Sequence, residues 1–144
     1  MSIETICQLL LATILGAIIG LERKFKKRLA GLQTYSLVSL GSCLITSTAI
    51  LLAKEGGVKD ASSIFSAIAI GVGFIGAGTI FRGEGKVEGI TTAAGLWVTA
   101  AIGLAVGVKF YFLAILTTFL ALLIFIGFGF LENKLFKKGS QETQ

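Results

Sequence analysis

Five stretches of the sequence are almost entirely apolar, and short polar segments separate them. None of the five carries a charged residue in its interior. Each is close to the length of about 20 residues that crosses a hydrocarbon core of about 30 Å. The pattern predicts transmembrane helices at Thr5–Leu21, Tyr35–Ala53, Ile64–Phe81, Ile90–Val108 and Phe110–Leu131. The expected fold class is therefore an all-α integral membrane protein, a bundle of five transmembrane helices.

Basic residues are distributed unequally among the polar segments. Ten lysines and arginines lie in the segments 23–28, 82–86 and 134–138, whereas three lie in the alternate segments, at Lys54, Lys59 and Lys109. Positive residues are retained on the cytoplasmic side of a membrane, so the count predicts an N-out, C-in orientation. The first apolar stretch has no basic segment before it and no A-x-A-like cleavage site, so we expect a retained helix rather than a signal peptide.

Small residues recur at helical spacing on three of the predicted helices. An interior glycine costs a water-soluble helix about 0.5–1 kcal/mol relative to alanine. In lipid, by contrast, small residues let two helix backbones approach closely. The spacing predicts helix packing at Gly16, Gly20, Gly73, Gly76, Gly78, Gly95, Gly103 and Gly107. The last predicted helix is rich in phenylalanine and leucine instead, and we expect it at the periphery of the bundle.

The composition argues against several kinds of functional site. The chain of 144 residues is 54% hydrophobic, with no proline and no histidine. The cysteines Cys7 and Cys43 fall inside predicted helices, so neither a disulfide framework nor a metal site is expected. No carboxylate is expected within the membrane and no nucleophile stands beside a base, so we expect no catalytic residue, no cofactor and no enzymatic activity. The basic residues that set the orientation account for the net charge of +5, so this charge does not indicate a nucleic-acid partner.

The two predicted cytoplasmic turns resemble each other. A shift of 58 residues places Gly78 on Gly20, Arg82 on Lys24 and Thr92 on Thr34. Our hypothesis is that the first two and the next two predicted helices form parallel repeats of a helical hairpin, as the halves of some transporters do. Such a repeat would bring both turns together at the cytoplasmic surface. The expected functional polar cluster consists of Glu22, Arg23, Thr34, Arg82, Thr91 and Thr92.

Two members of this cluster have alternative interpretations. Glu22 lies at a predicted membrane edge, where it either pairs with Arg23 or a basic residue of another loop, or binds a cation or a partner. Thr91 and Thr92 open the fourth predicted helix, and either hydroxyl could cap its first turn.

Four motifs stand in order along the chain: Gly20-Leu21-Glu22-Arg23, Ala30-Gly31-Leu32-x-Thr34, the segment 73–82 and the segment 89–103. Together they resemble the transmembrane domain of the MgtC/SapB (YhiD-like) family. The resemblance implies an inner-membrane bundle of about five helices in a virulence-associated family linked to survival under magnesium limitation. It also implies a regulator of membrane energetics, with the proton-translocating ATP synthase as a proposed target.

The chain departs from this family in two respects. Virulence-associated members carry a C-terminal cytoplasmic domain, whereas here we expect a short form, with a transmembrane domain at 1–138 and a polar tail at 139–144. The family's usual basic residue after Gly-Leu is Gln33 here, which argues against anion binding by the first turn.

Three functions remain open at this stage. The first is a non-enzymatic regulator that docks its glycine-lined helices against a membrane-protein partner. The second is a small channel or carrier for an ion or small solute, although such proteins usually place an ionisable group at the midplane. An enzyme is the third and the least favoured. Besides the lipid bilayer, the expected partners are a membrane protein or a second copy of the chain.

Overall fold

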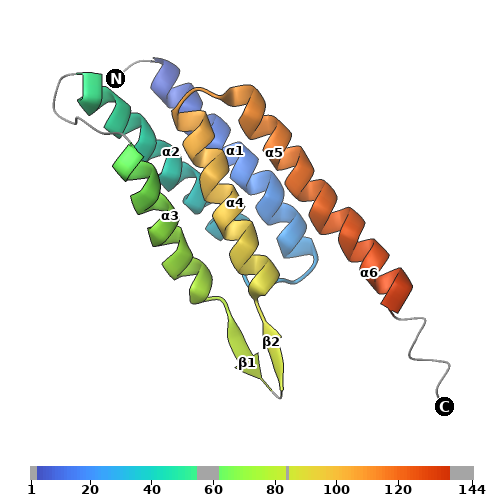
Figure 1. Cartoon of the computed structure of the whole chain (residues 1–144). Coiled ribbons are helices and arrows are strands. Elements are labelled where there is room, and N and C mark those ends of the chain that lie inside the picture. The colour runs from blue at the N-terminus through green and yellow to red at the C-terminus, as the bar shows by residue number, and fades with distance from the viewer. Residues whose placement is uncertain (1–2, 55–61, 84, 137–144) are drawn as a thin grey trace, which may run out of the picture.

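In the computed structural model, residues 3–54, 62–83 and 85–136 are described, and they form five helices and a small β-hairpin (Figure 1). The first four helices and the hairpin are α1 (Ile3–Phe25), α2 (Leu32–Lys54), α3 (Ser62–Ala77), β1 (Phe81–Gly83), β2 (Lys86–Glu88) and α4 (Ile90–Gly107). The last helix has three parts, α5 (Tyr111–Leu123), a π-helical turn η1 (Ile124–Phe128) and α6 (Gly129–Phe136). The predicted tail at 139–144 lies outside the described residues.

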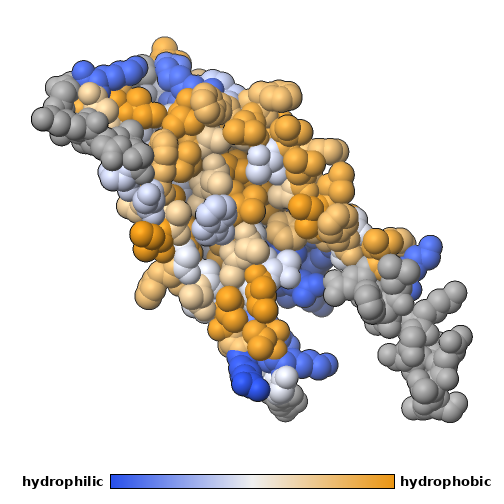
Figure 2. All heavy atoms as spheres, in the orientation of Figure 1, coloured by the Kyte–Doolittle hydropathy of each residue, from blue (hydrophilic) through white to orange (hydrophobic). Residues whose placement is uncertain are grey.

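Four of the helices are long and apolar enough to cross a membrane: α1, α2, α4 and the segment Tyr111–Leu131. Figure 2 shows hydrophobic residues over the middle of the visible face and hydrophilic ones gathered toward its two ends. The helix α3 has 16 residues, or about 24 Å at a rise of about 1.5 Å per residue, and so falls short of a full span. The expected all-α membrane bundle is therefore confirmed in outline, with one short helix.

The prediction that the third helix continues to Phe81 is wrong. The helix α3 ends at Ala77, where the N–H groups of Thr79 and Ile80 turn back to the carbonyls of Gly76 and Ala77 at 2.9 and 3.1 Å. These bonds span three residues and tighten the chain into a turn. Phe81 then begins β1.

A β-hairpin stands where the sequence predicts only a polar turn. The strand β1 pairs antiparallel with β2, with Arg82 opposite Val87, and the ribbon projects beyond the helices (Figure 1). The chain enters α4 at Gly89, whose φ of 91° favours glycine. A Cβ at Gly89 would also collide with the carbonyl oxygen of Thr79. Glycine at this position therefore lets the end of α3 and the start of α4 lie together.

Helix α4 is the centre of the bundle, because it contacts α1, α2, α3 and α5. Glycines make its approach to α2 close: a Cβ at Gly103 would collide with the carbonyl oxygen of Ser39, and one at Gly107 would lie 2.7 Å from Cβ of Thr46. Helix α1 approaches α2 as closely, because a Cβ at Gly16 would lie 2.6 Å from the carbonyl oxygen of Tyr35 and 2.9 Å from Cβ of Ser39. The helices α1, α2 and α4 thus pack nearly backbone to backbone.

The remaining predicted packing glycines differ in how closely a neighbouring helix approaches them. A Cβ at Gly20 would lie 2.8 Å from the backbone of α2, and a Cβ at Gly95 would lie 2.6 Å from the Tyr35 hydroxyl. On α3, Gly76 faces Ala93 at an ordinary 3.4 Å. Gly78 approaches only carbonyls of its own helix end, and a Cβ at Gly73 would meet nothing within 4 Å. Within the described part of the chain, a Cβ at Gly73 or Gly78 would therefore meet no other helix within 4 Å, and helix packing at these two glycines stays a prediction.

The peripheral position expected for the last helix agrees with the structure, since α5 contacts α1 and α4 and exposes much of its bulky surface. The two turns of the proposed repeat differ in structure. Residues 26–31 form an irregular turn, whereas residues 81–83 and 86–88 pair as the strands of a hairpin. The parallel repeat itself stays a prediction.

Candidate functional site: a basic pocket and a groove between helices

The end of α1 places three charged residues at the end of the bundle that carries the hairpin, called here the hairpin end (Figure 1). Lys26 Nζ lies 2.9 Å from Glu22 Oε1, and Arg23 Nη1 lies 3.6 Å from Glu22 Oε2. The pairing residues for Glu22 are therefore close in sequence, Arg23 next to it in α1 and Lys26 just after the end of α1. This ion pairing accounts for the acidic residue in an otherwise basic segment.

Arg23 is buried, with 3% of its surface exposed. Its guanidinium lies over the ring of Phe125 at 4.4 Å from the centroid, a cation–π contact. The Nε atom of Arg23 is buried without a hydrogen-bond partner. A cation in a basic segment normally lies in solvent, so the burial of Arg23 is the feature that the sequence least suggests.

Phe125 belongs to the π-helical turn η1, which the sequence did not predict. Lys26 Nζ donates a hydrogen bond to the carbonyl oxygen of Phe125 at 2.6 Å. Turns of this kind leave the regular helical hydrogen-bond ladder and occur frequently at functional sites. Two cations thus contact the last helix at Phe125: Arg23 lies over its ring, and Lys26 binds its carbonyl oxygen.

Tyr35 of α2 packs close to Phe125 inside the bundle. It is fully buried, and its hydroxyl donates to the carbonyl oxygen of Thr92 at 3.3 Å. A Cβ at Gly95 would lie 2.6 Å from the Tyr35 hydroxyl and 2.8 Å from Cζ of Phe125. Gly95 therefore makes room for both rings, one from α2 and one from η1.

Arg23 also lines a pocket of about 610 Å³, called here the basic pocket. One wall is the turn after α1, and the other is the strand β2 with the start of α4. The charged residues that line it are Arg23, Lys27, Arg28 and Glu88. Thr91 and Thr92 also line it, but neither caps α4, because Gly89 occupies the N-cap position with no side-chain hydrogen bond.

The predicted polar cluster is therefore only partly assembled in one place. The structure brings Arg23, Thr91 and Thr92 to the basic pocket, and Glu22 lies next to Arg23. Arg82 is exposed on β1 and does not line the pocket. Thr34 lies on α2 in a separate groove. The sequence analysis did not single out Lys27, Arg28 or Phe125. The signal for Lys27 and Arg28 is the dense run of basic residues, and the signal for Phe125 is the pair of glycines around Phe128.

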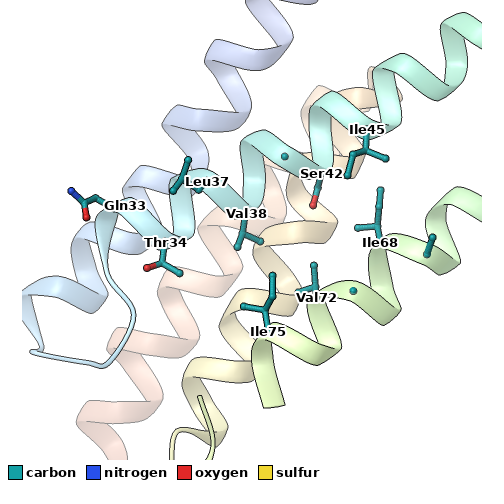
Figure 3. Close-up of a pocket in the computed structure, with 12 residues that line it drawn as sticks. Gln33, Thr34, Leu37, Val38, Ser42, Ile45, Ile68, Val72 and Ile75 are labelled. Carbon is teal, nitrogen blue, oxygen red and sulfur yellow. The ribbon is translucent and has the colours of Figure 1, made fainter. Parts of the chain in front are cut away.

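That groove, of about 630 Å³, lies between α2 and α3 and is called here the α2/α3 groove (Figure 3). Its walls are mainly apolar, with Leu37 and Ile45 on α2 and Ile75 on α3. Figure 3 shows Val38 and Ser42 of α2 on one side of it and Val72 of α3 on the other, with Gln33 and Thr34 at one end of α2. A Cβ at Gly41 or Gly71, which face the groove from the two helices, would meet nothing within 4 Å.

At the opposite end of the bundle, polar contacts secure the helix ends. Gln8 Nε2 donates to the carbonyl oxygens of Val106 and Gly107 at 3.0 and 3.3 Å, and so satisfies the end of α4. Glu4 pairs with Lys109, and the hydrogen bond that the Lys109 ammonium group donates to the Glu4 carboxylate raises the pKa of Lys109 above its usual value. Within the described residues, no three His, Cys, Asp or Glu side chains gather where they could hold a metal ion.

Comparison with known proteins assigns the chain to a family. The sequence profile of the MgtC family matches residues 9–134. The chain belongs to the MgtC family. The family resemblance predicted from the four motifs is thereby confirmed, and this MgtC-family chain is a membrane protein with four helices able to cross the bilayer.

Three curated relatives illustrate the relationship. SrpB of Synechococcus elongatus is 37% identical over 88% of this chain and 75% of its own length. YhiD of Escherichia coli K12, which is named as a candidate magnesium transporter, is 38% identical over 96% of this chain and 66% of its own length. MgtC of Salmonella typhimurium LT2 is 40% identical over 71% of this chain but only 42% of its own length. No solved structure matches this MgtC-family chain.

Proposed function

We propose that this MgtC-family chain is a non-enzymatic regulator in the bacterial inner membrane, acting in adaptation to magnesium limitation or on membrane energetics. It would act through helix contacts with a membrane-protein partner. The observation that carries the proposal is the α2/α3 groove, an apolar surface with a glycine on each wall and open space beside both glycines.

The chemistry of the groove suits a transmembrane helix. Glycines on both walls let the backbone of a partner helix approach closely. Close approach increases van der Waals packing, which contributes to helix association in lipid. Ser42 lines the groove from α2 (Figure 3), but only 4% of its surface is exposed, so the proposed contact rests on apolar packing. Within the described helices no charged residue lies at mid-span, which favours packing over ion conduction.

The proposed orientation is N-out and C-in, on the basis of the ten and three basic residues on the two sides. The hairpin end then faces the cytoplasm, and the Glu4–Lys109 pair faces outward. In this orientation the α2/α3 groove opens to lipid, and its polar end at Gln33 and Thr34 lies near the cytoplasmic surface.

Filling the groove tests the proposal. A deletion strain is grown across a magnesium series and complemented with wild type, Gly41→Leu or Gly71→Leu at matched membrane abundance. A Cβ at either glycine would meet nothing within 4 Å, so both variants are expected to fold and yet exclude the partner. Both should therefore fail to restore growth at low magnesium.

Gly73→Leu is the matched control, because Gly73 lies on the same helix as Gly71 with equally open surroundings but does not line the groove. It should restore growth. Restoration by all three variants would remove the groove from the mechanism, and growth that does not depend on magnesium would remove magnesium adaptation from the proposal.

A carrier for magnesium is the second candidate, favoured by the name given to the relative YhiD. Purified protein in liposomes loaded with a magnesium-sensitive dye separates the two candidates. The regulator predicts the same magnesium entry as empty liposomes. Entry that depends on the protein would favour the carrier.

A further inference from the structure

The basic pocket combines cations with the open amino end of a helix. Arg23, Lys27 and Arg28 line it, with Glu88 as the one carboxylate among its lining residues. The nearby charge of Glu22 is matched by Lys26. We propose that this pocket binds a phosphate group, either of free phosphate or of an anionic phospholipid headgroup at the membrane surface.

Arg23 is the first reason for this assignment. It lines the pocket but is 97% buried, and its Nε–H has no hydrogen-bond acceptor. A buried donor without an acceptor is unfavourable, and a phosphate oxygen would supply one. The planar guanidinium is also the side chain best suited to phosphate geometry, and its stacking on Phe125 fixes its plane.

The start of α4 is the second reason. This helix of 18 residues begins at Ile90, and its N-cap, Gly89, provides no side chain to bind the first N–H groups. A helix amino terminus carries a partial positive charge and donors that point out of the helix, so it favours an anion. The pocket lies at this terminus, and Thr91 and Thr92 in the first turn line it.

The turn after α1 completes the site. Lys27 has a φ of 52°, and the N–H groups of Lys27 and Arg28 bond back to the carbonyls of Lys24 and Arg23, both at 3.0 Å. This arrangement closes a Schellman motif at the helix end. It turns the chain so that Lys27 and Arg28 face the start of α4 across the pocket. Gln33 lies in the α2/α3 groove instead, so its neutral side chain does not weaken the site.

Two binding measurements on the intact protein distinguish the sources of phosphate. The first is equilibrium dialysis of radiolabelled inorganic phosphate against protein in phosphatidylcholine nanodiscs. The second is native mass spectrometry of phosphatidylglycerol retained by the delipidated protein, compared with phosphatidylcholine. Binding in the first supports a free-phosphate site, and selective retention in the second supports a headgroup site.

The variant Lys27→Gln/Arg28→Gln removes two pocket charges from the surface without touching buried Arg23. It should weaken binding by at least about tenfold in the arm that shows it. The control Lys24→Gln/Arg82→Gln removes the same charge from exposed residues at the same end that do not line the pocket, and should change binding less than about twofold. Equal weakening by both pairs, or no binding in either arm, would overturn the proposal.

Discussion

Lys26 Nζ donates a hydrogen bond to the carbonyl oxygen of Phe125 at 2.6 Å, although the two residues stand 99 positions apart in the chain. The contact joins the end of α1 to the π-helical turn in the last helix. Arg23, one turn earlier on α1, covers the ring of the same phenylalanine. At the hairpin end, Phe125 of the last helix therefore contacts two cations, Arg23 and Lys26.

Replacing Phe125 by leucine should loosen this attachment. Leucine keeps an apolar side chain but loses the ring beneath Arg23, so the free energy of unfolding should fall by roughly 1–2 kcal/mol, the value of a largely desolvated cation–π contact. Unfolding of the purified protein in detergent micelles by sodium dodecyl sulfate, followed by circular dichroism, measures the change. Phe128→Leu is the control in the same turn, because Phe128 is 60% exposed and should tolerate the change.

Alanine at Gly103 should destabilise the bundle. Its Cβ would collide with the Ser39 carbonyl oxygen at the crossing of α2 and α4, and such overpacking costs about 1–3 kcal/mol. Gly71→Ala should be neutral or stabilising by up to about 1 kcal/mol, because its Cβ meets nothing and alanine favours the helix. The same unfolding assay compares them, and equal losses would contradict the tight crossing.

Gln8→Leu should also lower stability, by about 1–3 kcal/mol, because it leaves the carbonyl groups of Val106 and Gly107 without their buried donor. The neighbouring change Cys7→Ser affects an exposed residue of the same helix and should have little effect. Hydrogen exchange at the end of α4 should rise in the Gln8 variant alone. Unchanged exchange there would mean that other groups satisfy these carbonyls.

The Glu4–Lys109 pair should persist to a higher pH than an isolated lysine would allow. Since the pKa of Lys109 is raised in the folded protein, the contribution of the pair to stability is fully present below the ordinary lysine pKa. It is lost as the pH rises through the raised value. Amine labelling followed by mass spectrometry should give a lower pKa for Lys109 in Glu4→Gln than in wild type. Equal pKa values would contradict the pairing.

The helices were predictable where a local pattern decides them. Five apolar stretches and the spacing of Gly16, Gly103 and Gly107 indicate both the helices and the close crossings, because hydropathy and residue size act within one helix face. The end of α3 was not predictable, since it depends on the approach of Gly89 to the Thr79 carbonyl in the following segment.

The candidate site was predictable only in part. Arg23, Thr91 and Thr92 were singled out because they flank predicted turns, and they line one pocket. The role of Phe125 was hidden, because a phenylalanine in a bulky apolar helix has the same appearance whether it faces lipid or a buried arginine. A pattern along one helix does not record which residue of a distant helix lies against it.

The most direct test of the proposed regulator is photo-crosslinking in living cells from the α2/α3 groove. A benzophenone amino acid replaces Ile75, a bulky residue that lines the groove, in one strain and Phe74, an exposed residue of α3 that does not line it, in another, and the tagged chain is purified after irradiation. The proposal predicts a discrete adduct with a different membrane protein from position 75 and none from position 74. Adducts with lipid alone, with a second copy of the chain, or from position 74 only would contradict the claim that this groove receives a partner helix.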